Sequence, residues 1–339
     1  MNAKISDKLK YILDYKQCKI TTAGQILEKD FGPDVWTIDQ LIPEQSITAI
    51  SGIQGSFKTW LTLEMARCLA TGEDFLGKFK TKQGNIMFVD KENNLKHIQK
   101  RMQKLGMNNI SDQIFYLDLM NPYDDFFIDK DIDFEKLLYA IENLEIKTVV
   151  FDSLVRVHTG DENDARNISK VMGLFRKITN IGVNVIFIHH HRKENSQTKK
   201  NPNSMRGSSD ISAAIDCLLM VDRSDDENSL RINQAKLRQS QAIEPFSIFI
   251  QDNKETGAIS FVYNGEYNPN KVAKEEAKNE ISTLLNEKDN VEMSRQDIIE
   301  ALSEDYKPAT VDEALKELVP DVLTKRRGPS NKFYFSVKK

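Results

Sequence analysis

The amino-acid sequence predicts an α/β fold with a mostly parallel central sheet, together with a small C-terminal domain of a different kind. Short apolar runs lie within residues 46–52, 84–90 and 147–152, and a helical pattern follows each run, directly or after a loop. Strands that alternate with helical patterns in this way are typical of a parallel sheet with crossover helices. From about residue 268 the pattern changes to successive helices and a hairpin. We therefore expect two folded domains.

Composition narrows the class of protein. The chain has 339 residues, 40% of them apolar and 29% charged, which is enough for one large core and a smaller one. Its net charge of −4 gives no general attraction to nucleic acid, so any such binding must come from local basic patches. Cys18, Cys68 and Cys217 lack the paired spacing of a zinc or disulfide site. With no apolar leader and no apolar run of the ~18 residues that span a bilayer, we expect a cytoplasmic protein without a membrane partner.

The chain divides into three segments. We expect an N-terminal helical lead-in of residues 1–45, a core of residues 46–265 and a C-terminal domain of residues 270–339. In the lead-in, apolar spacing predicts short helices near residues 9–13 and 24–29. The core carries the alternating strands and helices, and a ligand site is expected there, where the strands end.

Residues 46–61 predict a strand, a tight turn and a helix that stops at Gly72. The spacing of the turn is that of a phosphate-binding loop. In such a loop, backbone N–H groups surround a β-phosphate, Lys58 reaches the γ-phosphate, and the Thr59 hydroxyl holds Mg²⁺. The candidate nucleotide-binding residues are Gly52, Gln54, Gly55, Ser56, Phe57, Lys58 and Thr59.

Phe57 stands where the usual loop pattern has glycine. If the backbone there requires a positive φ, phenylalanine costs about 1–2 kcal/mol. The alternative interpretation is a chance Gly-Ser turn before a buried helix. The strand before the turn and the helix after it favour the phosphate loop.

Two further strands end in carboxylates. Glu92 follows the strand that ends at Asp90, and it is either a base that polarises the water attacking a γ-phosphate or a solvated turn residue. The strand at 147–152 ends in Asp152, where a carboxylate would hold Mg²⁺ beside Thr59 through the water shell of the ion. The pairing with the phosphate loop upstream strengthens the interpretation of Asp152, and the two interpretations of Glu92 stay open on its strand alone.

The connections between these strands show weaker patterns. Residues 95–105 predict a basic helix with a solvated outer face. Residues 112–133 are polar and acidic and predict a loop, and residues 134–144 predict another helix.

A strand at 183–188 leads into three consecutive histidines, His189, His190 and His191. Adjacent residues on a strand alternate sides, so the three cannot all bind one metal ion. We favour a single histidine that hydrogen-bonds near the γ-phosphate and senses the state of the nucleotide.

Residues 192–206 form a polar, basic loop, followed by a helix of small residues. The loop could track a phosphodiester backbone or be a solvated excursion. Strands at 217–221, 230–237 and 246–251 complete the sheet, and we expect the last two to be antiparallel at an edge.

Taken together, six blocks resemble RecA-type ATPases of the RepA-like (AAA_25-type) group, which includes hexameric replicative helicases and related mobile-element proteins. The resemblance runs from about Trp36 to Gln251. The blocks are residues 52–59, 88–92, 149–152, 160–164, 188–191 and 206–209.

The resemblance implies a RecA-like P-loop NTPase core, ATP and Mg²⁺ as cofactors, and the following roles. Lys58 would lie on phosphate, Thr59 and Asp152 on Mg²⁺, Glu92 would activate water, His190 would be the sensor, and Arg206 would be an arginine finger in the neighbouring subunit's site. Lys236 and Arg238 are a second candidate finger pair. A finger in trans implies a homo-oligomer, in this group a hexamer, with single-stranded DNA contacted through the 192–206 loop.

The C-terminal domain has its own signals. Residues 270–286 predict a helix, residues 294–297 a helix start, residues 310–313 a capping box before another helix, and residues 322–335 a hairpin. This order resembles a winged helix-turn-helix.

Charge leaves the partner of this domain open. The helix that would enter a major groove carries Asp312, Glu313 and Glu317, which would repel phosphates. The hairpin is basic, with Lys325, Arg326, Arg327 and Lys332. Contact with duplex DNA through the hairpin and docking to a protein therefore both stay open.

Three functions follow as hypotheses. The first is a ring-forming ATPase that moves or remodels single-stranded DNA for replication or maintenance of a mobile element. The alternative is a nucleotide-gated regulator that binds DNA or a protein through its tail and hydrolyses ATP slowly without translocation. The third, a phosphate-loop protein that acts on a small molecule, agrees least with the basic loop and the C-terminal domain.

Overall fold

The computed structural model describes residues 21–109, 112–117, 125–161, 164–190, 209–224, 228–287, 292–319, 321–328 and 332–338. By internal contacts the chain divides into two units, Met1–Val35 and Trp36–Lys339. The described part of the first unit contains helix α2 (Ala23–Leu27), where Thr22 and Gln25 form a capping box. None of its described residues is buried. The helix predicted near residues 24–29 is confirmed, and the one near residues 9–13 lies outside the described residues.

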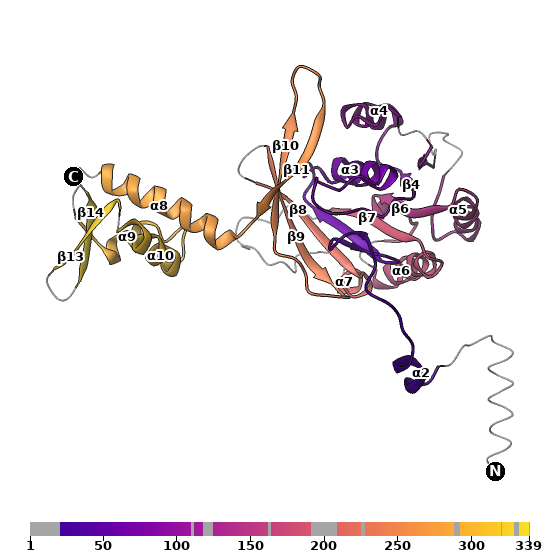
Figure 1. Cartoon of the computed structure of the whole chain (residues 1–339), viewed down its shortest axis with the longest axis horizontal. Helices are drawn as coiled ribbons and strands as arrows, with labels where there is room; N and C mark the ends of the chain where they lie inside the picture. The colour runs from indigo at the N-terminus through magenta and orange to yellow at the C-terminus, as the bar shows by residue number, and fades with distance from the viewer. Residues whose placement is uncertain are drawn as a thin grey trace, which may run out of the picture. The chain divides into compact units, whose positions relative to one another are not determined.

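The second unit is built on a central sheet (Figure 1). In the described residues its strand order is β11-β10-β9-β8-β3-β7-β6-β4-β5. The six strands β8, β3, β7, β6, β4 and β5 run parallel to one another. Strands β9, β10 and β11 each run antiparallel to the strands beside them. The bounds are β3 (Ile47–Gly52), β4 (Asn85–Asp90), β5 (Ile114–Tyr116), β6 (Ile146–Asp152), β7 (Asn184–His190), β8 (Cys217–Arg223), β9 (Ser229–Leu237), β10 (Phe246–Asp252) and β11 (Ile259–Glu266). The predicted α/β fold with a mostly parallel sheet is confirmed.

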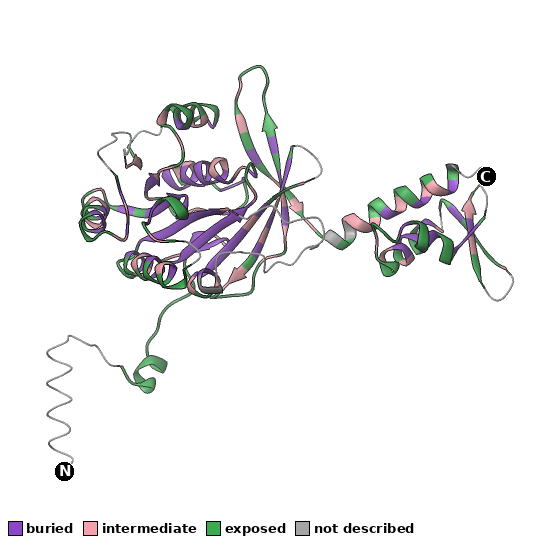
Figure 2. Cartoon of the chain, turned by 180° about the vertical axis from the view of Figure 1, so that it is seen from behind, coloured by how far each residue is buried: buried purple, intermediate pink, exposed green. Residues whose placement is uncertain are grey.

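Helices connect successive parallel strands and cover both faces of the sheet, so the central strands are buried on both sides (Figure 2). Alternate residues of one strand enter different core layers: Ile50 packs with α3, and Ala49 with α5 and α6. This double burial explains the continuous apolar runs in the sequence. The helices are α3 (Lys58–Thr71), α4 (Leu95–Lys104), α5 (Asp131–Asn143), α6 (Ala165–Asn180) and α7 (Ser209–Ala214).

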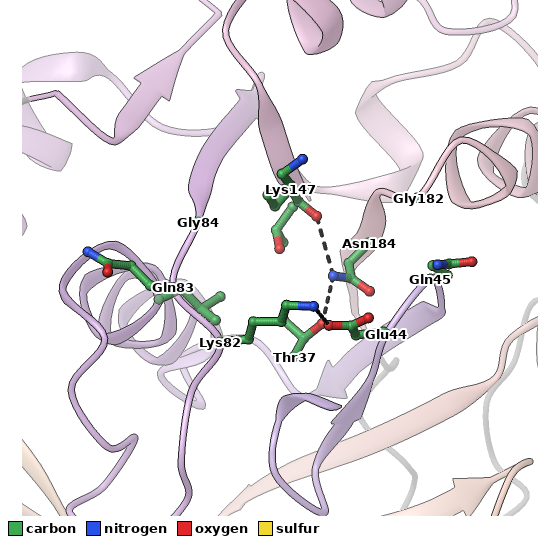
Figure 3. Close-up of a pocket in the computed structure, with 11 residues that line it drawn as sticks. Thr37, Glu44, Gln45, Lys82, Gln83, Gly84, Lys147, Gly182 and Asn184 are labelled. Atoms are coloured by element: carbon green, nitrogen blue, oxygen red, sulfur yellow. Dashed lines mark hydrogen bonds and ion pairs between the residues drawn. The ribbon is translucent and has the colours of Figure 1, made fainter. Parts of the chain in front are cut away.

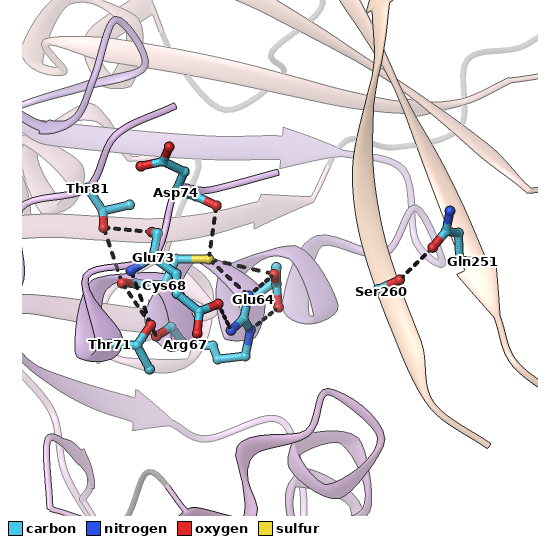
Figure 4. A network of polar contacts seen from close by, with 9 residues as sticks. All are labelled: Glu64, Arg67, Cys68, Thr71, Glu73, Asp74, Thr81, Gln251 and Ser260. Atoms are coloured by element: carbon cyan, nitrogen blue, oxygen red, sulfur yellow. Dashed lines mark hydrogen bonds and ion pairs between the residues drawn. The ribbon is translucent and has the colours of Figure 1, made fainter. Parts of the chain in front are cut away.

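Polar contacts fix the C-terminal half of α3 (Figure 4). Arg67 pairs with Glu64 at 2.8 Å and with Glu73 at 2.5 Å. The Thr81 hydroxyl donates to the carbonyls of Glu73 and Cys68, which ties the returning chain to the helix end. Burial raises the pKa of the Cys68 thiol to about 12, so this thiol is a neutral core group at physiological pH. Gly72 ends the helix with a φ of +79°, as predicted.

Several strands were not predicted. Residues 112–133 were expected to be a loop, which is wrong for β5; its Tyr116 ring stacks on Phe88 at 4.8 Å, a contact that no local pattern indicates. Strand β11 pairs with β10, so β11 and not β10 forms that edge of the sheet. A small antiparallel pair, β1 (Trp36–Ile38) and β2 (Ile42–Pro43), precedes β3 and buries Ile38 and Ile42 in the core.

The C-terminal module, residues 269–338, has its own core and sheet. It contains α8 (Pro269–Glu287), β12 (Met293–Ser294), α9 (Arg295–Ala301), α10 (Pro308–Leu318), β13 (Leu323–Arg327) and β14 (Phe333–Val337), with strand order β12-β14-β13. The predicted helix start at Ser294 is confirmed, since Ser294 and Asp297 form a capping box. The capping box predicted at residues 310–313 is wrong. Helix α10 begins earlier, because Pro308 is preset for the first helical position.

Every helix in the described ranges is too short or too polar to cross a membrane.

Candidate functional site

The carboxyl ends of four neighbouring strands, β4, β6, β7 and β3, bring together the predicted site residues that the structure describes. In the register of the sheet, Gly52 of β3 lies beside His190 of β7, and Asp90 of β4 lies beside Asp152 of β6. Parallel strands end at the same edge, so residues up to 138 positions apart in the sequence meet there. The site is therefore a product of strand order.

The phosphate loop joins β3 to α3. Gly55 has a φ of +81° and Phe57 a φ of +64°, so both adopt the left-handed conformation. Phenylalanine in that conformation costs about 1–2 kcal/mol. Arg223, at the end of β8, offsets part of this cost: its guanidinium lies 4.9 Å from the Phe57 ring centroid, and its Nε donates to the Gly55 carbonyl at 3.2 Å. A residue outside the loop thus stabilises the unusual Phe57.

Gly52 is required by close packing. A Cβ at this position would lie 2.3 Å from the Val221 carbonyl oxygen and 2.7 Å from the Ser56 hydroxyl. Neither contact can be relieved without moving β8 or the loop. The start of the phosphate loop is therefore fixed against the neighbouring strand.

We expect Gly52→Ala to lower the free energy of unfolding by about 1–3 kcal/mol, as overpacking does in other cores, and to weaken nucleotide binding because the loop shifts. Thermal unfolding and binding of a fluorescent nucleotide analogue measure both effects. The control is Gly173→Ala in α6, where a Cβ meets nothing within 4 Å; in a helix interior we expect it to stabilise by about 0.5–1 kcal/mol. Equal effects of the two changes would contradict the packing argument.

Lys58 is almost fully buried at the start of α3. Its Nζ donates to the carbonyls of Gly52 at 2.9 Å and Ile53 at 2.7 Å. Burial lowers the pKa of this amine to about 8, although Asp152 and Glu92 act in the opposite direction. The amine is thus held on the loop, at the point where the sequence predicts a phosphate.

Thr59 and Asp152 form the candidate metal site. The Thr59 hydroxyl donates to Asp152 Oδ2 at 2.7 Å. Asp152 is 2% exposed, and burial together with the nearby Asp90 carboxylate raises its pKa to about 7. A hydroxyl and a carboxylate are hard oxygen ligands, and a carboxylate with a raised pKa gains from a nearby cation. These residues fit Mg²⁺.

Glu92 and His190 lie across the same pocket, with His190 Nε2 3.3 Å from Glu92 Oε2. Both side chains are about one third exposed, so water can reach them. The pocket has a volume of about 310 Å³, which is within the range of small-ligand sites. Its lining residues are Gln54, Gly55, Ser56, Phe57, Lys58, Thr59, Trp60, Glu92, Asn93, Arg101, His190 and Arg223.

Comparison with known proteins identifies the family. The model of a family described as "AAA domain", AAA_25, matches residues 16–196, more than half of the 339-residue chain. The chain belongs to the AAA_25 family. The match includes the phosphate loop, both carboxylate strands and His190. The resemblance to RecA-type ATPases of the RepA-like group is thereby confirmed, and the protein is a P-loop ATPase, a class that binds a nucleotide with a divalent metal ion.

Other comparisons are distant. A solved structure described as an "ATPase Domain" is 15% identical in sequence to this chain, with a TM-score of 0.48. The match covers 65% of this chain and 85% of the solved one. No curated protein matches the chain.

The structure of this AAA_25 ATPase adds site residues that the sequence analysis missed. Trp60, Asn93, Arg101 and Arg223 all line the pocket. Arg101 was assigned to a solvated outer face, which is wrong, because it is half-buried and faces the site. Its position three residues after the buried Ile98 places it on the inward side of α4, and that spacing could have indicated it.

Of the candidate fingers, Lys236 and Arg238 are described, and neither lines the pocket. Arg206, His191 and the 192–206 loop are outside the described residues. Lys236 Nζ donates to the Ser212 carbonyl at 2.5 Å, and Arg238 donates to the Ala213 carbonyl at 2.6 Å, so both anchor α7 within their own chain. A role for either in a neighbouring copy stays a prediction.

A second pocket of about 240 Å³ lies at the amino ends of the parallel strands, opposite the carboxyl ends that carry the first pocket (Figure 3). Asn184 donates to Thr37 Oγ1 at 2.7 Å and to the Lys147 carbonyl at 3.3 Å, and Lys82 pairs with Glu44. These polar groups bind one another across the pocket. We assign them to the packing of β1 and β2 against the sheet.

We expect Asp152→Asn to stabilise the metal-free AAA_25 ATPase near pH 8. The carboxyl pKa is raised from 3.8 to about 7 in the folded state, which corresponds to a destabilisation of up to roughly 4 kcal/mol. The folded state binds the proton more tightly, so the penalty is absent below pH 4 and grows as pH rises toward 7. Chemical unfolding in EDTA at several pH values measures the difference between wild type and variant. A difference that does not vary between pH 4 and 8 would contradict this account.

Proposed function

We propose that this ATPase hydrolyses ATP as part of a ring of identical subunits and uses the energy to move along or remodel single-stranded DNA. The observation that carries the proposal is one pocket lined by Lys58, Thr59, Glu92 and His190, in which Thr59 donates to the buried Asp152 and Glu92 lies 3.3 Å from His190. Phosphoryl transfer to water needs these three elements: a cation on the phosphates, oxygen ligands for Mg²⁺ and a base for the water.

Each residue has a distinct task in this proposal. Lys58 leaves the loop carbonyls and binds the terminal phosphates. Thr59 and Asp152 hold Mg²⁺, which when bound neutralises charge on the triphosphate. Glu92 takes the proton of the attacking water. His190, the last residue of β7, orients the Glu92 carboxylate and couples its position to that strand.

An arginine from a neighbouring subunit would complete the site. In the described part of the chain, the cations that line the pocket are Lys58, Arg101 and Arg223. Arg101 donates to Asn93 Oδ1 and Arg223 to the Gly55 carbonyl, so we assign both guanidiniums to holding the site and not to the γ-phosphate. This supports a finger supplied in trans, for which Arg206 is the first candidate, and hence a ring, proposed to be a hexamer with DNA along the 192–206 loop.

The test combines two measurements. The ATPase rate is measured with and without single-stranded DNA, and the mass of the assembly is measured with and without nucleotide. Stimulation by single-stranded DNA together with a nucleotide-dependent ring supports the motor. A monomer whose ATPase rate is the same with and without single-stranded DNA would contradict it.

The C-terminal module supports a second candidate, a nucleotide-gated regulator that binds duplex DNA or a protein. The acidic charge of α10 is partly neutralised inside the module: Asp312 pairs with Arg295 and Glu317 with Lys274, both at 2.5 Å. The helix therefore repels phosphates less than its sequence suggested. Among the described residues, Lys325, Arg327 and Lys332 of the hairpin have no carboxylate partner within ion-pair distance.

We propose a winged-helix function for this module. The three helices and the β13–β14 hairpin support it, and so does Lys325 Nζ lying 4.0 Å from the centroid of the Phe333 ring, which is 39% exposed. Tight duplex binding with negligible stimulation of turnover by single strands would favour the regulator. Unwinding of a forked duplex that is lost in Arg206→Ala would favour the motor.

A further inference from the structure

A chain of hydrogen bonds leads from α4 to the candidate metal site. Arg101 Nη1 donates to Asn93 Oδ1 at 3.1 Å. Asn93 Nδ2 donates to Asp90 at 3.1 and 3.2 Å and to Asp152 Oδ2 at 3.2 Å. One side-chain amide therefore bridges two carboxylates, and one arginine holds that amide.

We propose that Asn93 and Arg101 are positioning residues that set the geometry of the metal site, an inference that rests on the proposed function. Asp90 and Asp152 lie side by side in the register of β4 and β6. Two adjacent carboxylates repel each other, and a donor shared between them keeps both at a fixed separation. Asn93 supplies that donor without adding charge.

Arg101 and the two carboxylates together hold the Asn93 amide. The amide has a donor end and an acceptor end. The carboxylates accept from the NH₂ group, and Arg101 donates to Oδ1 from the side of α4, so both ends are bonded. Without Arg101 the amide oxygen loses its donor, and the Asn93 side chain gains freedom to turn away from Asp90 and Asp152.

Arg101 is itself held by the phosphate-loop helix. Its guanidinium carbon lies 5.6 Å from the centroid of the Trp60 ring, and Trp60 follows Thr59 directly in the sequence. The path from Thr59 through Asp152, Asn93, Arg101 and Trp60 thus returns to its starting point. A closed circuit of this kind couples the position of α4 to both metal-binding side chains.

Contacts around Asp90 also fix the position of Glu92. The backbone N–H groups of Glu92 and Asn93 both donate to Asp90 Oδ1 at 2.9 Å. The turn that presents Glu92 is therefore wrapped around Asp90, and the Asn93 side chain closes it. Loss of Arg101 should disturb the metal ligand Asp152 and the base Glu92 together.

The test measures metal affinity directly, with Mn²⁺ as the probe and ADP bound. Electron paramagnetic resonance of free Mn²⁺ gives its Kd for wild type, Arg101→Ala, Asn93→Ala and the double variant. Outer contacts of metal ligands typically change affinity about 10–100-fold, so we expect each single variant to raise the Kd about tenfold. We expect the double variant to match either single one, because both changes break the same path.

Three comparisons separate positioning from general damage. Lys100→Ala, an exposed neighbour on α4, should leave the Kd unchanged, and Arg101→Lys should recover part of the affinity. In EDTA, ADP affinity read from Trp60 fluorescence in a Trp36→Phe background should change less than twofold. The Mg²⁺ concentration for half-maximal hydrolysis should rise in parallel with the Mn²⁺ Kd.

A lower Tm with an unchanged Mn²⁺ Kd in Arg101→Ala would overturn the inference. A double variant whose increase in Kd equals the product of the two single increases would overturn it as well. Wild type that binds Mn²⁺ with ADP but does not hydrolyse ATP would overturn the proposed function alone, since the binding comparison still reports on positioning. Wild type that binds no Mn²⁺ would overturn both.

Discussion

We expect Lys58→Ala to reduce ATP hydrolysis at least 100-fold. Removing a charged group that stabilises the transition state costs about 10²–10³ in rate, and the lost charge-assisted hydrogen bond, worth about 1.5–3 kcal/mol, weakens nucleotide binding as well. The amine already lies on the loop, where it donates to the Gly52 and Ile53 carbonyls, and it exchanges these partners for phosphate oxygens when the nucleotide binds. Steady-state ATPase assays and nucleotide titrations measure both losses.

Lys58 should also give wild type a pH signature. Its amine has a pKa of about 8 without ligand, and a bound phosphate favours the protonated form. Nucleotide affinity should therefore fall as pH rises through 8, a fall that Lys58→Ala removes. The control is Lys80→Ala, an exposed lysine outside the pocket, for which we expect unchanged rates.

We expect Glu92→Gln to reduce the rate of ATP hydrolysis by about 10²–10⁴ while leaving nucleotide affinity within a few-fold of wild type. General-base catalysis typically contributes a factor of that size. Glutamine keeps the shape of the side chain and can still accept from His190, so the change removes only the basic carboxylate. Single-turnover hydrolysis, compared with equilibrium binding of ATP, separates the two quantities.

The matched control is Glu135→Gln on the exposed side of α5, which should hydrolyse ATP like wild type. If Lys58→Ala and Glu92→Gln both retained wild-type turnover, the assignment of this pocket as the hydrolytic site would fall. A loss of binding in Glu92→Gln would instead make this side chain part of the nucleotide contact and not the base.

Phe57 illustrates how a loop that departs from the usual pattern is accommodated. The sequence showed the substitution and its cost, and the backbone at Phe57 is indeed left-handed. What offsets the cost is Arg223, which is 166 residues later in the chain and contacts both the Phe57 ring and the Gly55 carbonyl. No pattern around residue 223 indicates this contact.

Local patterns sufficed for much of the fold. Apolar runs gave the parallel strands, because a strand buried on both faces needs apolar side chains on both. The Gly72 stop and the Ser294 capping box gave helix ends, because unpaired backbone groups there need local partners. The prediction failed at β5 and β11, because these strands form by pairing with other strands of the sheet. It also failed at the start of α10, because Pro308 sets the first residue of that helix.

The sequence by itself determined the phosphate loop, the apolar strands and the carboxylates that follow them, because each depends on neighbours within a few residues. The sequence also predicted Asp152 beside Thr59, and the structure brings the two together at 2.7 Å. Only the tertiary structure decided that Glu92 faces His190 and that Arg101 and Asn93 hold the carboxylates. Those contacts depend on the order and register of β3, β7, β6 and β4 in the sheet. Strand order is set by the packing of the whole core, and it leaves no trace in the spacing of any single motif.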